Sequence, residues 1–186
     1  MSYEFSEGYH IRNQGAPHYL TFTIVGWIDL LSRQIYKDLL LESFTYCKKN
    51  KNLEVHAFVI MTNHVHTIWT AKDNNLSDVI RDFKTFTSKS FIKIINETPE
   101  SRREWLLHMF NFYSKQTLAN KKFKIWTNNN HPEEIFSQDF FYQKLLYIHQ
   151  NPVRAGIVYK EIDYMYSSAT NYANRKSIFE IDLLLT

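Results

Sequence analysis

The stretch LEVHAFVIMTNHVHTIWTA, residues 53–71, decides the fold. Its two halves, 53–61 and 64–71, are rich in β-branched and aromatic residues, which favour strands. Thr62 and Asn63 separate the two halves and can form a turn. The stretch therefore predicts two neighbouring strands of an antiparallel sheet.

Helical and extended segments alternate on both sides of this pair, because apolar residues recur first at strand spacing and then at helix spacing. The expected elements are a strand at 18–27, helices at 33–49 and 76–97, a helix from Glu100 through Tyr113, a strand at 123–127, and a helix at 137–151 ending against Pro152. This order predicts an α+β fold, a ferredoxin-like βαββαβ antiparallel sheet with helices on one face. In that topology the 64–71 strand is central.

The composition indicates a folded chain with a large aromatic core. Of the 186 residues, 44% are hydrophobic, 22% charged and 16% aromatic, which argues against a mainly disordered protein. We expect a single domain over 1–186, with a helical insertion at about 99–120 and a tail at about 174–186. The single Cys47 excludes a disulfide framework and a Cys-rich zinc site.

The chain has no apolar signal core at its start and no apolar run that approaches the ~18 residues of a membrane span. A lone cysteine also suits a reducing compartment. These features predict a cytoplasmic protein with no membrane partner.

The strongest chemical signal is the pair His64 and His66. Side chains two residues apart on a strand point to the same face, so both imidazoles project together while Val65 points away. Such a pair can bind a metal ion, although hydrogen-bonded or exposed histidines would give the same pattern.

A second polar pattern lies on the predicted helix 137–151. Gln143, Tyr147 and Asn151 follow one another at intervals of four, which places them on one helix face. An amphipathic helix with an exposed tyrosine would look similar. Two imidazoles and one amide oxygen would leave positions open on Mg²⁺ or Mn²⁺ for phosphate oxygens and water. A tyrosine–phosphate bond stores the energy of the phosphodiester, so this set suits strand cleavage and rejoining.

Basic residues interleaved with aromatic ones indicate single-stranded nucleic acid as a partner, although the net charge is only +3. Each of these cations taken alone could equally be a solvated surface residue. The candidate DNA contacts are Lys84, Lys89, Lys121, Lys122, Lys124, Trp126, His131 and Arg154.

Two strings resemble a known family. HAFVIMTNHVHTIWT (56–70) resembles the metal-binding strand of the HUH single-strand nucleases and transposases, and LLYIHQNPVRAGIV (145–158) resembles the catalytic helix of single-tyrosine transposases. The likeness is greatest to the REP-associated tyrosine transposases and covers most of residues 9–173. Further matching strings are LSDVIRDFKTFTSKSF (76–91), KIWTNNNHPEEI (124–135) and DYMYSSATNY (163–172).

The resemblance implies a role for each matching residue. His64, His66 and Asn151 would bind Mg²⁺ or Mn²⁺, Tyr147 would be the nucleophile, and Gln143 could orient its phenol. The substrate would be single-stranded DNA with a hairpin, cleaved through a 5′-phosphotyrosine intermediate by a nucleoid-associated enzyme. The chain could act as a monomer or as a homodimer that shares the tyrosine helix between subunits.

Three alternatives stay open on the sequence alone: an inactive, domesticated DNA-hairpin-binding protein, a small HxH metal hydrolase without a DNA role, and a plasmid relaxase or replication initiator. The tyrosine-transposase hypothesis requires the phenol of the late helix to face the two imidazoles of the central strand.

Overall fold

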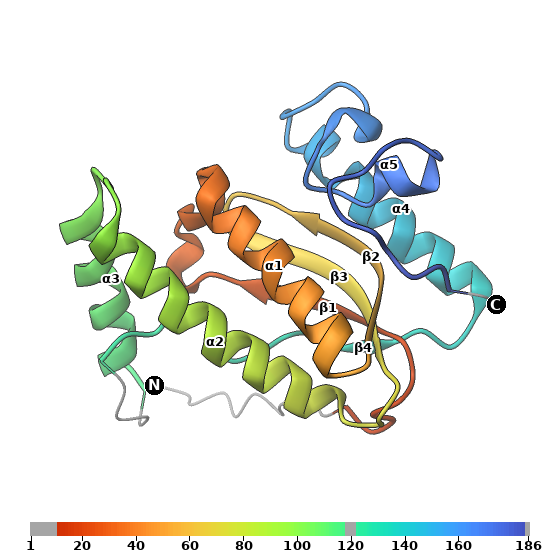
Figure 1. Ribbon diagram of the computed structural model, residues 1–186, viewed down its shortest axis with the longest axis horizontal. Coiled ribbons are helices and arrows are strands. Elements are labelled where there is room, and N and C mark those ends of the chain that lie inside the picture. Colours follow the sequence, from red (N-terminus) through yellow and green to blue (C-terminus); the bar gives the residue numbers. More distant parts are fainter. Residues whose placement is uncertain (1–10, 118–121, 185–186) are drawn as a thin grey trace, which may run out of the picture.

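A computed structural model describes residues 11–117 and 122–184 of the chain. Its centre is an antiparallel sheet of four strands in the order β2-β3-β1-β4 (Figure 1). The strands are β1 (His18–Thr23), β2 (Leu53–Ile60), β3 (His64–Ala71) and β4 (Glu133–Glu134). The prediction that the 64–71 strand is central is therefore confirmed.

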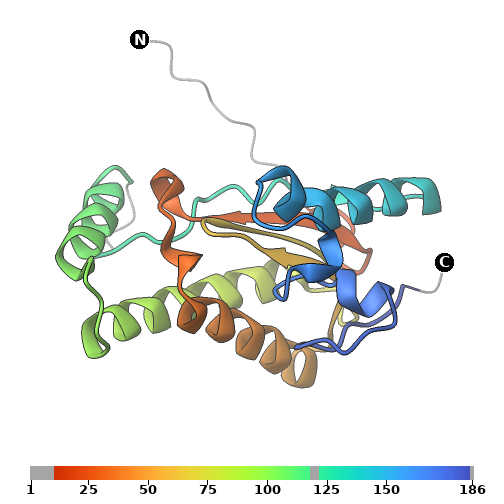
Figure 2. The ribbon, with the colours of Figure 1, turned by 90° about the horizontal axis from the view of Figure 1, so that it is seen from above.

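Helices lie on both faces of this sheet, so the prediction of helices on one face is wrong (Figure 2). Those on one face are α1 (Gln34–Asn50) and α2 (Leu76–Glu97), whereas α4 (Gln138–Arg154) lies on the opposite face (Figure 2). The remaining elements are α3 (Arg103–Lys115), the short helix α5 (Ala169–Tyr172), and the 3₁₀ turns η1 (Val25–Trp27), η2 (Leu30–Ser32) and η3 (Glu161–Asp163).

The alternation of side chains along β3 explains how the sheet serves both layers. Val65 is fully buried in the core that includes Phe22 of β1 and Phe44 of α1, because its side chain points away from the imidazoles. His64 and His66 point to the other face, toward α4. The same strand thus supplies core residues to one layer and polar groups to the other.

Two predicted strands differ from the observed ones. The first strand ends at Thr23, because the chain turns into η1 at Val25. The predicted strand at 123–127 is wrong: this segment makes only an isolated bridge, Ile24 to Trp126, and the fourth strand is formed by residues 133–134. Ile125 and Trp126 are buried, and this burial accounts for their strand-like composition.

The helix predicted from Glu100 is present as α3, which begins at Arg103 rather than at Glu100. The side chain of Glu100 is instead buried and accepts hydrogen bonds from Arg33 and Tyr36, both at 2.8 Å. Burial alone would raise the pKa of Glu100, but these bonds, together with the backbone N–H of Arg102, hold it at about 2. The ionised carboxylate therefore ties the start of α3 to α1.

Gly26 is required where η1 meets α3. Its φ is +63°, and an added Cβ would overlap the phenol ring of Tyr113. We expect Gly26→Ala to lower the free energy of unfolding by about 1–3 kcal/mol, measured by urea denaturation. Gly156 has φ +70° but open space around it, so Gly156→Ala measures the cost of the backbone conformation alone. Its free energy of unfolding is expected to fall by less than that of Gly26→Ala. Equal losses in the two variants would contradict the steric explanation.

A buried histidine makes the stability of the fold depend on pH. Burial lowers the pKa of His149 from 6.5 to about 4, partly opposed by the charge of Glu161. Below pH 6.5 the unfolded chain takes up a proton that the folded chain does not, so this contribution to the free energy of unfolding is complete above that pH and is lost toward pH 4.

Between about pH 7 and about pH 4, the free energy of unfolding of the wild type is expected to fall by about 2–3 kcal/mol more than that of His149→Gln. Urea denaturation at the two pH values measures the difference. The exposed His108 provides the control, because His108→Gln should leave the pH dependence unchanged. Parallel pH profiles of the wild type and His149→Gln would contradict the prediction.

Candidate active site

The late helix brings a tyrosine against the histidine pair of its own chain. The ring of Tyr147 on α4 meets the ring of His66 edge-on, with 5.2 Å between centroids, and the two imidazoles are 4.7 Å apart. Tyr147 is 41% exposed, whereas His66 is buried. The phenol is therefore accessible to a large substrate, while the imidazoles form the floor of the site.

Hydrogen bonds fix the orientation of both imidazoles. Nδ1 of His64 lies 2.6 Å from Oδ1 of Asn63, and Nδ1 of His66 lies 2.7 Å from the hydroxyl of Tyr19 and 3.0 Å from that of Thr21. Partners of this kind hold the rings of metal-binding histidines. With each Nδ1 engaged, the Nε2 atoms are the nitrogens left for coordination.

Burial keeps these imidazoles neutral. It lowers the pKa of His66 to about 3, with further lowering from His64, Arg154 and Lys144, and it lowers the pKa of His64 as well. A histidine must be deprotonated to bind a metal ion. Both rings are thus in the form that binds metal throughout the neutral range.

Asn151 completes the set of donors. Its side chain interacts with His64 and partly opposes the lowering of that pKa, which places an amide beside the imidazoles one helical turn after Tyr147. Within residues 11–117 and 122–184, no three His, Cys, Asp or Glu side chains converge on a metal-sized site. Two imidazoles and one amide nevertheless fit a divalent ion that takes its remaining ligands from water and phosphate oxygens.

The helix continues past Pro152, contrary to the prediction that it ends there. Proline lacks only its own N–H, and the last turn closes through the bond from Ala155 N–H to the carbonyl of Asn151. Gly156, with φ +70°, is the residue that ends the helix.

The extra turn brings Arg154 back to the nucleophile. Its guanidinium lies 4.4 Å from the centre of the Tyr147 ring and donates to the Tyr147 carbonyl at 2.8 Å. Arg154, predicted as a phosphate contact, is therefore also part of the support of Tyr147.

A pocket of about 380 Å³ opens beside Tyr147 and His66. Gln143 and His131, both predicted as site residues, line it together with Glu133 and Lys144. The ammonium group of Lys144 is 2.6 Å from the Glu133 carboxylate and 4.5 Å from the centre of the Tyr19 ring. The ion pair of Lys144 and Glu133 thus lines the same pocket as Tyr147 and His66.

The predicted phosphate-binding lysines have different surroundings. Lys84 is largely enclosed and donates to Thr127 O and Asn130 Oδ1, both at 2.6 Å, and burial lowers its pKa to about 8. Its ammonium group therefore holds the 127–130 loop. The others are Lys89 and Lys122, which are exposed, Lys124, which is partly buried, and Lys121, which lies outside the described residues.

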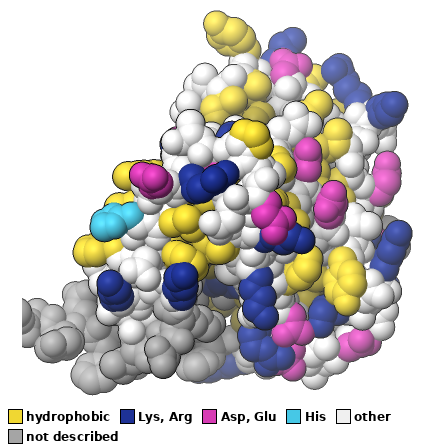
Figure 3. Space-filling view, turned by 60° about the vertical axis from the view of Figure 1, so that its left-hand side comes forward, with side chains coloured by type: hydrophobic (Ala, Val, Ile, Leu, Met, Phe, Trp, Pro, Cys, Tyr) yellow, Lys and Arg dark blue, Asp and Glu magenta, His cyan; other side chains and the backbone are white. Residues whose placement is uncertain are grey.

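Charge is mixed on the face that carries α3. Lys and Arg side chains lie among Asp, Glu and apolar groups there and do not form a continuous basic surface (Figure 3). A DNA strand on this face would meet separate cations. The DNA contacts proposed for individual cations therefore stay predictions.

Trp126, a candidate DNA contact in the sequence, lies in the core instead. The side chain is 4% exposed, packs against Phe22, Phe83 and Phe91, and donates its indole N–H to Thr87 at 3.0 Å. It belongs to the core on the α2 side of the sheet.

Sequence reasoning missed the residues that support the histidines. Tyr19 and Thr21 alternate on β1, and the register pairs Thr21 directly with His66. Two hydroxyls at strand spacing are a weak signal, because their value depends on a register that the sequence does not specify. The sequence predicts only a turn at Asn63 and gives no sign of its bond to His64.

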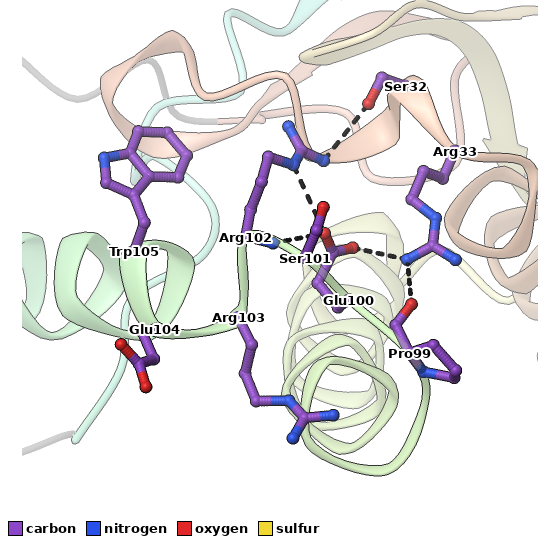
Figure 4. Close-up of a pocket in the computed structure, with 9 residues that line it drawn as sticks. All are labelled: Ser32, Arg33, Pro99, Glu100, Ser101, Arg102, Arg103, Glu104 and Trp105. Atoms are coloured by element: carbon purple, nitrogen blue, oxygen red, sulfur yellow. Dashed lines mark hydrogen bonds and ion pairs between the residues drawn. The ribbon is translucent and has the colours of Figure 1, made fainter.

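A larger pocket of about 1070 Å³ lies between η2 and the start of α3 (Figure 4). Arg33, Arg102 and Arg103 line it, but each guanidinium is engaged: Arg33 and Arg102 with Glu100, and Arg103 with the carbonyls of Ile95 and Thr98. The groups that would attract an anion are therefore used to join α1, α2 and α3.

Comparisons with known proteins bear on the family and the fold of the chain. No helix in the described ranges combines the length and hydropathy of a membrane span. No curated protein sequence matches the chain. A solved structure described as "Structure of the REP associates tyrosine transposase bound to a REP hairpin" covers 100% of both chains, with a TM-score of 0.62 and 18% identity.

The family described as "Transposase IS200 like" matches residues 28–144, well over half of the chain. The match includes His64 and His66 and stops three residues before Tyr147, so the tyrosine is assigned on geometry and on its own string. The resemblance found in the sequence is confirmed at the level of the family: the chain belongs to the IS200-like transposases.

Proposed function

We propose that this transposase cleaves and rejoins single-stranded DNA next to hairpins through a 5′-phosphotyrosine intermediate. The observation that carries the proposal is the contact of Tyr147 with His66 in one chain, at 5.2 Å between ring centres, with Asn151 beside His64. Binding alone requires none of these groups in this arrangement.

In each step of the proposed reaction, one phosphorus–oxygen bond forms and another breaks. The phenol oxygen of Tyr147 attacks the scissile phosphorus, and the bond from phosphorus to the 3′ oxygen breaks. The phenol proton ends on that 3′ oxygen, leaving a free 3′ hydroxyl and a tyrosine ester of the 5′ phosphate. Attack by a 3′ hydroxyl on this ester reverses the step, so rejoining needs no nucleotide cofactor.

His64, His66 and Asn151 would hold Mg²⁺ or Mn²⁺. When bound, the ion polarises the phosphate and offsets the charge that develops on it. The chain itself supplies the arrangement of the nucleophile: Arg154 lies on the Tyr147 ring, and Gln143 lines the same pocket within reach of the incoming strand. The buried imidazole of His66 excludes water from one side of the site.

The hairpin in the proposed substrate is inferred from the similar structure, which is described as bound to a REP hairpin. Exposed Lys89 and Lys122, with His131 at the pocket, are the groups proposed to contact its backbone. Such contacts make affinity fall steeply with salt, unlike the binding of a small uncharged hydrolase substrate.

The test uses labelled hairpin oligonucleotides taken from the DNA that flanks the gene, with unpaired extensions on both sides. Incubation with Mn²⁺ or Mg²⁺ is expected to give a covalent protein–DNA adduct on a denaturing gel, and EDTA is expected to prevent it. Tight hairpin binding without any adduct would instead identify an inactive DNA-binding protein. If the protein neither binds the hairpin nor forms an adduct, the DNA function is excluded.

A further inference from the structure

Trp27 presents its indole ring to solvent beside the histidine pair. The side chain is 69% exposed, and its ring meets that of His64 at 6.0 Å between centroids with a 62° tilt. Ring contacts run from Tyr147 to His66, from His66 to His64 and from His64 to Trp27. The metal-binding pair therefore lies between the nucleophile and an exposed tryptophan.

The backbone holds this ring outside the core. Trp27 has φ +56°, a conformation that costs a non-glycine residue about 1–2 kcal/mol and persists only where the surroundings impose it. Its neighbours Val25 and Ile28 are both buried, and Gly26 packs against Tyr113 of α3. Because the residues on both sides are anchored, the backbone at Trp27 is held in one place and presents the indole beside His64.

A hydrogen-bond path links this position to the site. Asn63 donates to the carbonyl of Trp27 at 3.3 Å through Nδ2 and accepts from His64 through Oδ1 at 2.6 Å. The same turn residue thus sets the place of the indole and the orientation of the imidazole. A large apolar ring, held exposed and tied to a metal-binding residue, is poorly explained by folding stability.

We propose that Trp27 is a base-stacking platform for an unpaired nucleotide next to the scissile phosphate. The inference rests on the proposed function, since its ligand is the single strand cut by Tyr147. A flat aromatic face accepts any base, so stacking would fix the strand at the metal site whatever its sequence. With the scissile phosphate at the imidazoles, the strand would continue past His64 onto the indole.

Fluorescence provides a direct test. The chain has 4 tryptophans, of which Trp69 and Trp126 are buried and Trp105 is 47% exposed. In a Trp105→Phe protein, Trp27 is the one exposed tryptophan, and its emission should be quenched when a hairpin oligonucleotide with unpaired flanks binds. Binding without any change of emission would overturn the proposal, and this measurement leaves Trp27 itself unaltered.

An abasic scan identifies the stacked base. Each unpaired position of the flanks is replaced in turn by an abasic site, and affinity is measured by fluorescence anisotropy in a Tyr147→Phe background that does not cleave. One position is expected to weaken binding roughly 5- to 100-fold. Asparagine tolerates the positive φ, so Trp27→Asn should weaken binding of intact DNA by a similar factor. An abasic site at the same position should then cause no further loss of affinity in this variant.

Two further variants serve as controls. Trp27→Phe keeps a stacking ring and should retain most of the affinity, and Tyr46→Ala removes an aromatic side chain that is 59% exposed on α1, on the opposite face of the sheet, and should change nothing. Identical abasic profiles for Trp27→Asn and its parent would overturn the stacking role while leaving the cleavage proposal intact. Failure of the unsubstituted protein to bind or cleave any hairpin would overturn both.

Discussion

Tyr147→Phe is expected to abolish covalent capture of a hairpin oligonucleotide while hairpin affinity stays within about twofold of the wild type. Phenylalanine keeps the ring that contacts His66 and Arg154 but has no oxygen to attack phosphorus. Loss of a nucleophile commonly lowers the rate by about 10³-fold or more. The adduct is measured on denaturing gels and the affinity by anisotropy.

Tyr142 provides the matched control for this experiment. It lies on the same helix, is 54% exposed, and is five residues before Tyr147, so it points to another side of α4. Tyr142→Phe should form the adduct at the wild-type rate. An adduct that persists in Tyr147→Phe, or one that disappears in Tyr142→Phe, would show that the nucleophile is assigned to the wrong residue.

His64→Ala is expected to remove Mn²⁺ binding and to reduce cleavage by about 10²-fold or more. The substitution removes one of the two imidazoles and leaves Asn151 without its neighbour in the site. Isothermal titration with Mn²⁺ measures the loss of binding independently of activity. The expected effect is large because, among the described residues, no third His, Cys, Asp or Glu side chain lies at the site to replace the histidine.

His108→Ala is the control for the metal experiment, because His108 is an exposed histidine on α3. Metal affinity and cleavage should both remain at the wild-type level in that variant. Undiminished Mn²⁺ affinity in His64→Ala would move the ion away from β3 and would contradict the proposed ligand set.

Local patterns predicted the parts of the site that depend on a single element. His64 and His66 share a strand face by alternation, and Tyr147 and Asn151 share a helix face by their spacing of four. The structure brings these two pairs together, as catalysis would require. Prediction succeeded here because each pair lies within one regular element whose geometry is fixed by the backbone.

Features set by packing between distant segments were not predictable in the same way. Glu133–Glu134 has no strand-like composition and forms β4 because its neighbours are held against β1, with Ile135 N–H donating to the carbonyl of Pro17. Trp126 resembled a nucleic-acid contact because basic residues surround it in sequence, yet it fills the core. Trp27 gave no signal at all, since its exposure depends on the anchoring of Val25 and Ile28.

In this structure the nucleophile and the histidine pair come from one chain, and an active site built in this way has a genetic consequence. A copy of the protein without Tyr147 and a copy without His64 could not restore each other by associating, because each would still lack half of its own reactive centre. Co-expressed inactive alleles should therefore fail to complement, and a defective subunit should not poison an intact one.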